Sequence, residues 1–382
     1  MYPQLPVDFG FTEEHELLRQ SVRRFLEERC PFSEVRRLAA DPLGYDPGLW
    51  KEMAMLGWIG LTLSEGSGGA GLGQLHLALV LDEMGRRLLP GPFLASVLAG
   101  FALEAAGSDA QRRRFCAPIA AGELLATLAL GEPAASWEPE HVAATAEPVE
   151  GGWVLRGLKT GVLSAASAGL VIAPFVTPDG TPALFAVELP ATGVAVEPEI
   201  GIDPTRRTAR VAFDGARVGR EACLEGPGLE GLRTSYRRGY VALAAEMVGG
   251  TEAVLELTRR YAIERKQFER QIGSFQAVKH PIVDTMVGLE LARTHALAAA
   301  VALDQGAAEA EVAARMAKAI ASDVFPTAVR RGVQLHGGYG FTWDCDVHFY
   351  FKRALWSRAT LGDGAHHRRH LASRLLDDPT PA

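Results

Sequence analysis

Apolar residues recur at helical spacing through the first third of the chain. Thr12 has the side chain of a helix N-cap, and Glu13 and Glu14 follow it, where carboxylates stabilise the first turn of a helix. The apolar stripe of this helix consists of Leu17, Leu18, Val22, Phe25 and Leu26. Three further helices are expected over residues 49–56, 74–88 and 108–122. The pattern predicts a helical domain over residues 1–123.

The pattern changes over residues 124–228, which hold ten of the 22 prolines of the chain. Proline interrupts long helices, so this stretch favours strands and loops. Turn dipeptides such as Asp179-Gly180 and Asp214-Gly215 separate several short apolar runs. These runs cover residues 124–130, 153–156, 170–176, 184–189 and 210–213. A small β-barrel or sandwich is expected here.

Helical periodicity returns over residues 229–382. The three longest helices are expected over residues 232–264, 275–305 and 308–335, and shorter ones over 348–356 and after 365. Pro281 and Pro326 lie inside two of these helices, where kinks are expected. Helices of this length usually pack in an antiparallel bundle. The expected fold is mainly α, with an N-terminal helical domain (1–123), a middle β-domain (124–228) and a C-terminal four-helix bundle (229–382).

Composition excludes several classes of function. The net charge of −7 does not favour nucleic-acid binding. The four cysteines are far apart and form no CxxC pair, so neither a zinc site nor a disulfide framework is expected. No apolar run was expected to reach the length that a membrane span requires. Residues 1–4 lack a basic n-region, so no export signal is expected, and we expect a cytoplasmic protein.

The first segment with candidate chemistry is Arg265-Lys266-Gln267-Phe268, which is followed by Ile272, Phe275 and Gln276. A guanidinium group offers a planar fork of donors to phosphate oxygens, and a phenyl ring can cover a flat ring of a ligand. Ser274 is expected to cap a helix that starts at Phe275. The alternative is that Arg265 is a solvated arginine at a helix end and that Phe268 belongs to the core.

A second segment lies about 70 residues further on and reads Gln334-Leu335-His336-Gly337-Gly338. Because glycine has no side chain, Gly337 and Gly338 allow the backbone to approach a ligand closely. They also follow a long predicted helix, so they are candidates for its C-cap, and both roles are compatible. His336 is expected to pack or to form a hydrogen bond rather than to bind a ligand.

Together the two segments resemble the flavin-contacting motifs of the acyl-CoA dehydrogenase family, and the order of the three domains is also similar over essentially the whole chain. The resemblance implies FAD as cofactor, an acyl-CoA substrate that is desaturated at the α,β bond, and an electron-transfer flavoprotein as electron acceptor. It also implies a homo-oligomer or a heterotetramer with an unlike subunit, as in a bacterial subgroup with pimeloyl-CoA-type and steroid-type members. The FAD-binding residues that it implies are Arg265, Phe268, Ile272, Phe275, Gln276, Gln334, Gly337 and Gly338.

The family base is a glutamate in the loop after the fourth bundle helix, and this loop reads Thr360-Leu361-Gly362-Asp363 here. Alignment places Gly362 or Asp363 at the base position, and Asp363 is the only carboxylate in the loop. The alternative role for Asp363 is the N-cap of the last helix. Other members carry the base on the first bundle helix, at the position of Gly239. Glu246 on that helix is expected to be structural.

The middle domain departs from the family pattern. Glycine occupies position 131, where many members have a flavin-contacting threonine, and Gly161 and Leu163 replace a tryptophan and a threonine. These differences leave open a non-catalytic partner subunit, and a flavin oxidase or oxygenase on the same fold is a further alternative. His366 and His367 point about 100° apart on a helix, so no metal site is expected.

Overall fold

The computed structural model describes residues 10–134 and 136–377. Contacts divide the described chain into two compact units, which we treat separately. The helical unit comprises residues 10–37, 74–89 and 240–377, and the mixed unit comprises residues 38–73, 90–134 and 136–239. Residues 1–4, on which the expectation of no export signal rests, lie outside the described residues, as do the outermost ends of the first and third predicted domains.

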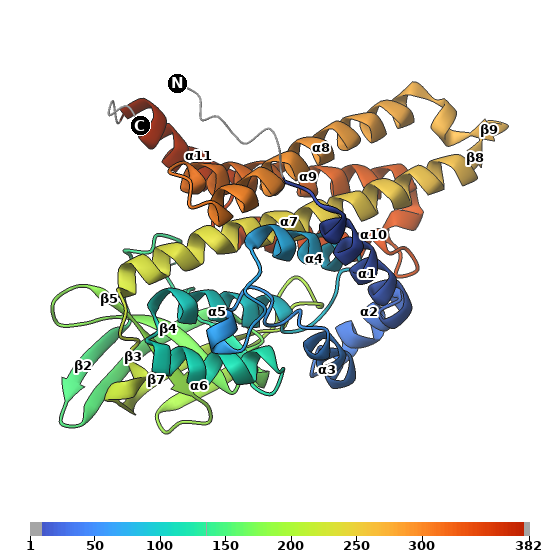
Figure 1. Ribbon diagram of the computed structural model, residues 1–382. Helices are drawn as coiled ribbons and strands as arrows, with labels where there is room; N and C mark the ends of the chain where they lie inside the picture. Colours follow the sequence, from blue (N-terminus) through green and yellow to red (C-terminus); the bar gives the residue numbers. More distant parts are fainter. Residues whose placement is uncertain (1–9, 135, 378–382) are drawn as a thin grey trace. The chain divides into compact units, whose positions relative to one another are not determined.

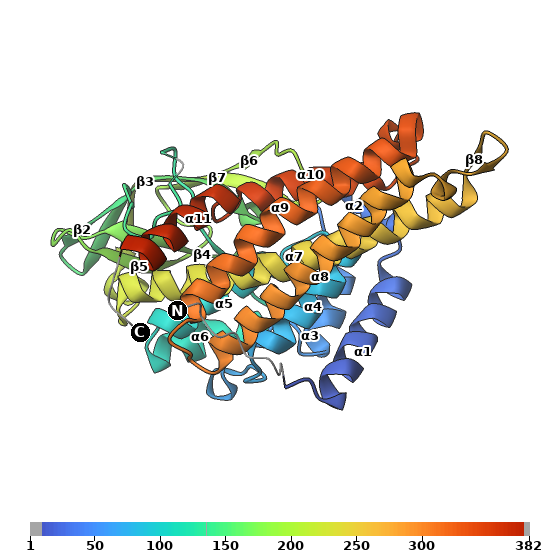
Figure 2. The same ribbon diagram turned by 90° about the horizontal axis from the view of Figure 1, so that it is seen from above.

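The helical unit consists of long helices joined by short connections (Figures 1 and 2). Its helices are α1 (Glu13–Arg29), α4 (Gln74–Arg86), α8 (Gln276–Asp304), α9 (Ala310–His336), α10 (Val347–Ala359) and α11 (Gly364–Ala372). The long helix α7 (Gly228–Glu264) and α2 (Phe32–Ala40) each have one end in this unit and one in the other. Helices α8, α10 and α11 all pack against α9. The predicted bundle helices are thus present, with ends within a few residues of those expected.

Local hydrogen bonds explain where several helices begin. The Thr12 hydroxyl lies 2.8 Å from His15 Nδ1, and the Thr12 N–H donates to the same nitrogen, so the predicted N-cap of α1 is confirmed. The expected cap at Ser274 is wrong. Its hydroxyl donates to the Gln271 carbonyl at 2.7 Å inside a 3-10 turn (Ile272–Ser274), and α8 begins two residues later at Gln276.

Helix α8 differs from the expectation on membrane spans. It is the one helix among the described residues whose length and composition would allow it to cross a membrane. Of its most apolar window, 44% is buried inside the structure, and the helix packs against α9 and α4. Its last residue, Asp304, accepts hydrogen bonds from the first two backbone N–H groups of α4. These are the contacts of a bundle helix.

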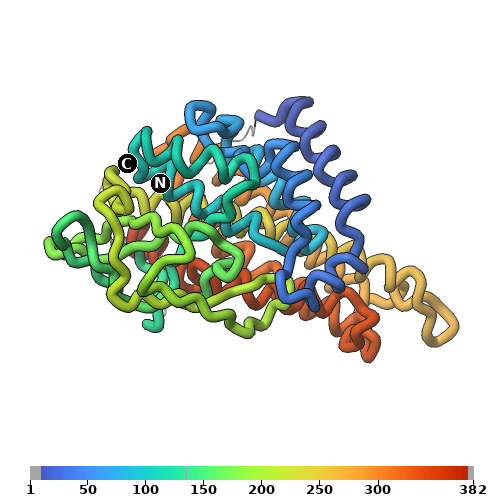
Figure 3. Tube along the Cα trace, turned by 90° about the horizontal axis from the view of Figure 1, so that it is seen from below, coloured from blue at the N-terminus to red at the C-terminus, as the bar shows by residue number. Residues whose placement is uncertain are grey.

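The mixed unit contains three complete α-helices and one seven-stranded sheet, whose strands follow the green to yellow-green stretch of the tube in Figure 3. The helices are α3 (Pro47–Met55), α5 (Phe93–Ala106) and α6 (Asp109–Ala120). The strands are β1 (Ala126–Leu128), β2 (Thr145–Val149), β3 (Gly152–Leu163), β4 (Leu170–Val176), β5 (Pro182–Glu188), β6 (Val194–Glu199) and β7 (Thr208–Gly219). Their order is β1-β4-β2-β3-β7-β6, with β5 also paired to β4.

The core of the sheet is built on three phenylalanines. The Phe175 ring meets Phe185 and Phe213 edge to face, with centroids 5.5 and 5.0 Å away. All five strands expected from apolar runs are present, whereas β2 and β6 were missed. Each of these two strands contains a proline, Pro148 or Pro198, which reads against a strand in sequence but is accommodated in the folded sheet.

Candidate functional site

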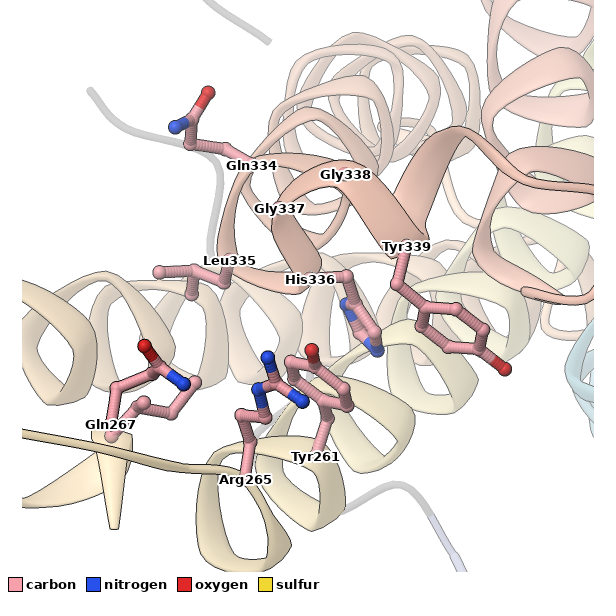
Figure 4. A pocket seen from close by; sticks show the side chains of 10 residues that line it. Tyr261, Arg265, Gln267, Gln334, Leu335, His336, Gly337, Gly338 and Tyr339 are labelled. Atoms are coloured by element: carbon pink, nitrogen blue, oxygen red, sulfur yellow. The ribbon is translucent and has the colours of Figure 1, made fainter. Parts of the chain in front are cut away.

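The two sequence-distant segments meet in the helical unit around a cavity of about 660 Å³ (Figure 4). The cavity is lined by Tyr261, Arg265, Gln267, Ile272, Gln334, Leu335, His336, Gly337, Gly338 and Tyr339. Figure 4 shows the Arg265 side chain beside the Tyr261 ring, with the His336 and Tyr339 rings next to them, while the Gln334 side chain points away from this group. The cavity therefore contains five of the eight residues that the resemblance assigns to FAD.

Arg265 follows the last residue of α7 and is solvent-exposed. Within residues 10–134 and 136–377, its guanidinium group has no hydrogen-bond or ion-pair partner. Five N–H donors are therefore available to an anion in the cavity, and a phosphate matches their planar geometry. The diphosphate of FAD fits this donor set.

Gly337 and Gly338 combine the two roles that the sequence left open. Gly337 is the C-cap of α9, with a φ of 60°, a backbone conformation that favours glycine. A Cβ atom added to Gly337 or Gly338 would meet no other atom within 4 Å. The backbone thus faces open space beside the cavity, and a flat ligand can approach it.

A group of stacked rings forms one side of the cavity. The Tyr261 ring lies 4.5 Å from the His336 ring and 6.0 Å from the Tyr339 ring, with interplanar angles of 24° and 14°. His336 Nδ1 is 2.8 Å from the Gly332 carbonyl oxygen, and burial lowers the pKa of His336. His336 therefore packs and forms a local hydrogen bond, as expected. Tyr261 was missed, although it lies four residues before Arg265 on the same helix face.

Phe268, Phe275 and Gln276 lie outside the cavity. Phe268 and Glu269 form the tip of a two-stranded hairpin, β8 (Lys266–Gln267) and β9 (Arg270–Gln271), with φ angles of 54° and 64°. The Phe268 side chain is 85% exposed, so its assignment to the core is excluded. The Phe275 ring lies 4.0 Å below the Arg270 guanidinium carbon, and Gln276 is the exposed first residue of α8.

Asp363 lies at the other end of α9, in the connection between α10 and α11. Its Oδ1 accepts a hydrogen bond of 2.9 Å from the His366 N–H, so it caps α11. This hydrogen bond lowers the pKa of Asp363, which is therefore ionised at neutral pH. The neighbouring Ala365 N–H also lowers the pKa of the Asp363 carboxyl group. A Cβ atom added to Gly362, the alternative base position, would lie 2.4 Å from the His366 ring.

Comparisons with known proteins agree with this architecture. The acyl-CoA dehydrogenase N-terminal domain matches residues 12–123, and the acyl-CoA dehydrogenase C-terminal domain matches residues 227–376. The acyl-CoA dehydrogenase IpdE2 of Mycobacterium tuberculosis is 32% identical, over 96% of this chain and 99% of its own length. The chain belongs to the acyl-CoA dehydrogenase family. It is accordingly an FAD-dependent oxidoreductase of the acyl-CoA dehydrogenase type.

Two further proteins are similar to this chain over nearly its whole length. The (R)-benzylsuccinyl-CoA dehydrogenase of Thauera aromatica is 28% identical, over 97% of this chain and 98% of its own length. The structure of the ChsE4-ChsE5 complex from Mycobacterium tuberculosis superposes with a TM-score of 0.89 at 26% identity. That comparison covers 98% of this chain and 100% of the other.

Two glycines occupy the positions at which many acyl-CoA dehydrogenases carry flavin contacts, and both lie in the mixed unit. A Cβ atom added to Gly131 would lie 2.5 Å from the Thr160 carbonyl oxygen, and the Thr160 N–H donates to the Gly131 oxygen. Gly161 has a φ of 62° and lies in an irregular part of the β3–β7 ladder, between Lys159 and Val162. A side chain at position 131 would therefore overlap the backbone, whereas a Cβ atom added to Gly161 would meet nothing within 4 Å and only the left-handed φ disfavours a side chain there.

Glu132, which follows Gly131 in the chain, has a structural role. Glu132 accepts hydrogen bonds from the Ala143 and Ala144 N–H groups and from Lys159 Nζ at 2.5 Å. Lys159 is fully buried and also donates to the Pro174 carbonyl at 2.7 Å. Burial lowers the pKa of Lys159 to about 8. Glu132 is thus fully engaged inside the mixed unit.

Glu246 is also engaged. It is 2% exposed and forms an ion pair with Arg353 of α10, which is 1% exposed. Glu246 is therefore a structural residue that ties α7 to α10, as expected from the sequence.

Proposed function

We propose that the protein desaturates an acyl-CoA thioester at the α,β bond, with Asp363 as the base, and that the Arg265 cavity binds an FAD held mainly by the neighbouring subunit. The observation that carries the proposal is the unpaired Arg265 guanidinium group in a cavity whose glycine backbone is open to a ligand. FAD, when bound, supplies the acceptor for the hydride that leaves the β-carbon. Arg265 binds its diphosphate, and Gly337 and Gly338 admit its adenosine end. Phe268, Phe275 and Gln276 meet the cofactor from the hairpin beside the cavity.

Asp363 removes the α-proton in this proposal. Its carboxylate is ionised at neutral pH, as a base must be before it accepts a proton. A bound thioester would exclude water from the carboxylate and raise its pKa toward the working pH. Asp363 is shorter than the usual glutamate by one methylene group, so the substrate must approach its backbone more closely.

The assembly that we propose has two or more subunits, with closed symmetry, and electrons leave to an electron-transfer flavoprotein. The tight backbone at Gly131 supports a heterotetramer, in which an unlike subunit's sheet holds the flavin ring. A homo-oligomer is the alternative. Light scattering at micromolar concentration tests this, and a monomer in the presence of every candidate partner would refute it. The three-domain division at residues 123 and 228 and a cytoplasmic location belong to the same proposal.

The experiment is purification of the full chain, alone and with a co-expressed unlike subunit. Each preparation is assayed for its flavin-to-protein ratio and for dye reduction with straight-chain, dicarboxylic and branched acyl-CoA thioesters. We expect bound FAD and formation of the α,β-unsaturated thioester, detected by mass spectrometry. Dye reduction in neither preparation would overturn the proposal, and oxygen consumption without an unsaturated product would indicate an oxidase.

A further inference from the structure

Two fully buried ionisable side chains hold the connection between α10 and α11. Lys318 lies on α9 and His367 on α11, and both are 0% exposed. Neither belongs to the FAD cavity. Both form hydrogen bonds with backbone carbonyl groups of the connection, residues 360–363, which carries Asp363.

The hydrogen bonds of the Lys318 amine all go to neutral oxygen atoms. Its Nζ donates to the Gly362 carbonyl at 2.7 Å, to the Ser322 hydroxyl at 2.9 Å and to the Arg358 carbonyl at 3.3 Å. The Arg358 carbonyl is among the last four of α10, which have no partner within the helix. One side chain therefore caps α10 and also fastens the connection that follows it. Burial lowers the pKa of Lys318 to about 7.

His367 binds the carbonyl group of Leu361, the residue before Gly362. Its Nε2 lies 3.0 Å from the Leu361 carbonyl oxygen, which can only accept, so we assign the proton to Nε2. Burial, with Lys318 nearby, lowers the pKa of His367 to about 2, so the ring is neutral. Its edge packs against the Tyr240 ring, with centroids 4.6 Å apart.

The backbone of the connection requires such support. Leu361 has a φ of 58° and Gly362 a φ of 90°. The left-handed conformation is unfavourable for a residue with a side chain, and it persists where surrounding contacts impose it. The carbonyl groups of the two left-handed residues are those that His367 and Lys318 bind. Each of the two left-handed residues therefore has its carbonyl group bound by one buried side chain.

We propose that Lys318 and His367 are positioning residues, which fix the 360–363 connection and thereby place the Asp363 carboxylate for proton removal. This inference rests on the proposed function, in which Asp363 is the base. Lys318 and His367 neither line the cofactor cavity nor form a hydrogen bond with the carboxylate oxygens, so their hydrogen bonds act through the backbone that carries Asp363. The Lys318 amine also interacts electrostatically with the Asp363 carboxylate.

The test uses the full chain with its FAD, and with the unlike subunit where activity requires it. The variants are Lys318→Met and His367→Leu, and neither new side chain has a hydrogen-bond donor. His367→Gln is the conservative variant, because its amide nitrogen can replace Nε2 as donor. Lys51→Met, at an exposed lysine of α3, is the matched control. Hydrogen–deuterium exchange of peptides over residues 355–370 is measured beside kcat and KM per bound FAD.

We expect exchange over residues 355–370 to accelerate about tenfold in Lys318→Met and His367→Leu. In the same variants kcat should fall about 10- to 100-fold, because a displacement of about 1 Å has effects of this size. KM and the flavin-to-protein ratio should not change, and His367→Gln should recover most of both losses.

Unchanged exchange in both donor-free variants would overturn the inference. Faster exchange with unchanged kcat would overturn it as well, since the two residues would then serve stability alone. A wild-type enzyme that reduces no dye with any thioester would overturn the proposed function instead. The exchange measurement would still decide in that case whether Lys318 and His367 hold the connection.

Discussion

Gly337 and Gly338 of the helical unit and Gly131 of the mixed unit differ in the space around them. A Cβ atom added to either of the first two would meet nothing within 4 Å, whereas one added to Gly131 would lie 2.5 Å from a backbone oxygen. The absence of a side chain serves ligand access in the first case and close backbone packing in the second. Glycine in a family motif therefore marks a binding site only where the structure leaves the adjacent space empty.

The cations of the two regions differ in the same way. Arg265 is exposed and its guanidinium group has no partner among the described residues, while Lys159 is buried and bonded to Glu132 and to the Pro174 carbonyl. A cation without a partner beside a cavity is available to an anionic ligand, and a buried, fully bonded one is not. The comparison supports the proposal that the cofactor-binding donors of this chain lie in the helical unit.

The largest expected effect concerns the carboxylate of the helical unit. Asp363→Asn should lower flavin reduction by acyl-CoA by about 100-fold or more, because a general base contributes about 10²–10⁴-fold. Asparagine caps helices about as well as aspartate, so FAD content and Tm should not change. Asp363→Ala should also cost about 1 kcal/mol of folding free energy, through loss of the cap. Full turnover in the asparagine variant would reduce Asp363 to a helix cap.

The second-largest expected effect tests whether FAD binds to the helical unit through Arg265. Arg265→Ala should weaken FAD retention about 10- to 100-fold, since a hydrogen bond to a charged group contributes about 1.5–3 kcal/mol. Arg259→Ala is the matched control, because Arg259 is exposed on the same helix and outside the cavity. The measurement is the flavin-to-protein ratio after dialysis. An equal loss of FAD in both variants would point to general charge rather than to the cavity.

Sequence patterns predicted most of the helical unit, because its helices are long and their caps are local. In the helical unit, Thr12 caps α1 as predicted. In the mixed unit, the predicted strand Leu170–Val176 has the same ends in the structure. The prediction at Ser274 was wrong, because a serine near a helix start can bond a preceding carbonyl as readily as a helix N–H. Strands β2 and β6 were missed, because they are short and largely exposed and so lack the apolar run that identified β4.

Only those residues of the candidate site that belong to the two sequence motifs could be predicted from the sequence. Arg265 and Gln334 were identified from sequence, and the structure brings them to one cavity. Tyr261 was not identified, since a tyrosine at helical spacing is more often a core residue. The roles of Lys318 and His367 were also hidden, because they depend on which carbonyl groups a distant connection presents.

A third variant tests whether the packing at Gly131 excludes a flavin contact. Gly131→Thr restores the residue that many family members carry, but its Cβ would overlap the Thr160 oxygen. We expect a loss of about 1–3 kcal/mol in the free energy of unfolding, as for other overpacked sites, and no gain in bound FAD. Gly66→Ala is the control, because an added Cβ there meets nothing within 4 Å. Tighter FAD binding in Gly131→Thr would show that this sheet can take part in the flavin site.

The smallest expected effect is the pH dependence that Lys318 confers on stability. Its pKa is about 7 in the folded protein, against an ordinary value of 10.5, so between these values the unfolded chain binds the proton more tightly. The free energy of unfolding should therefore rise with pH above 7, by at most about 1.4 kcal/mol per pH unit from this group. Lys318→Met lacks the titrating amine, so the difference between wild type and variant should grow from pH 7 to pH 9. Denaturant unfolding at both pH values measures it. A pH-independent difference would mean that the buried amine titrates outside this range, and that Lys318 contributes hydrogen bonds without the cost of a buried charge.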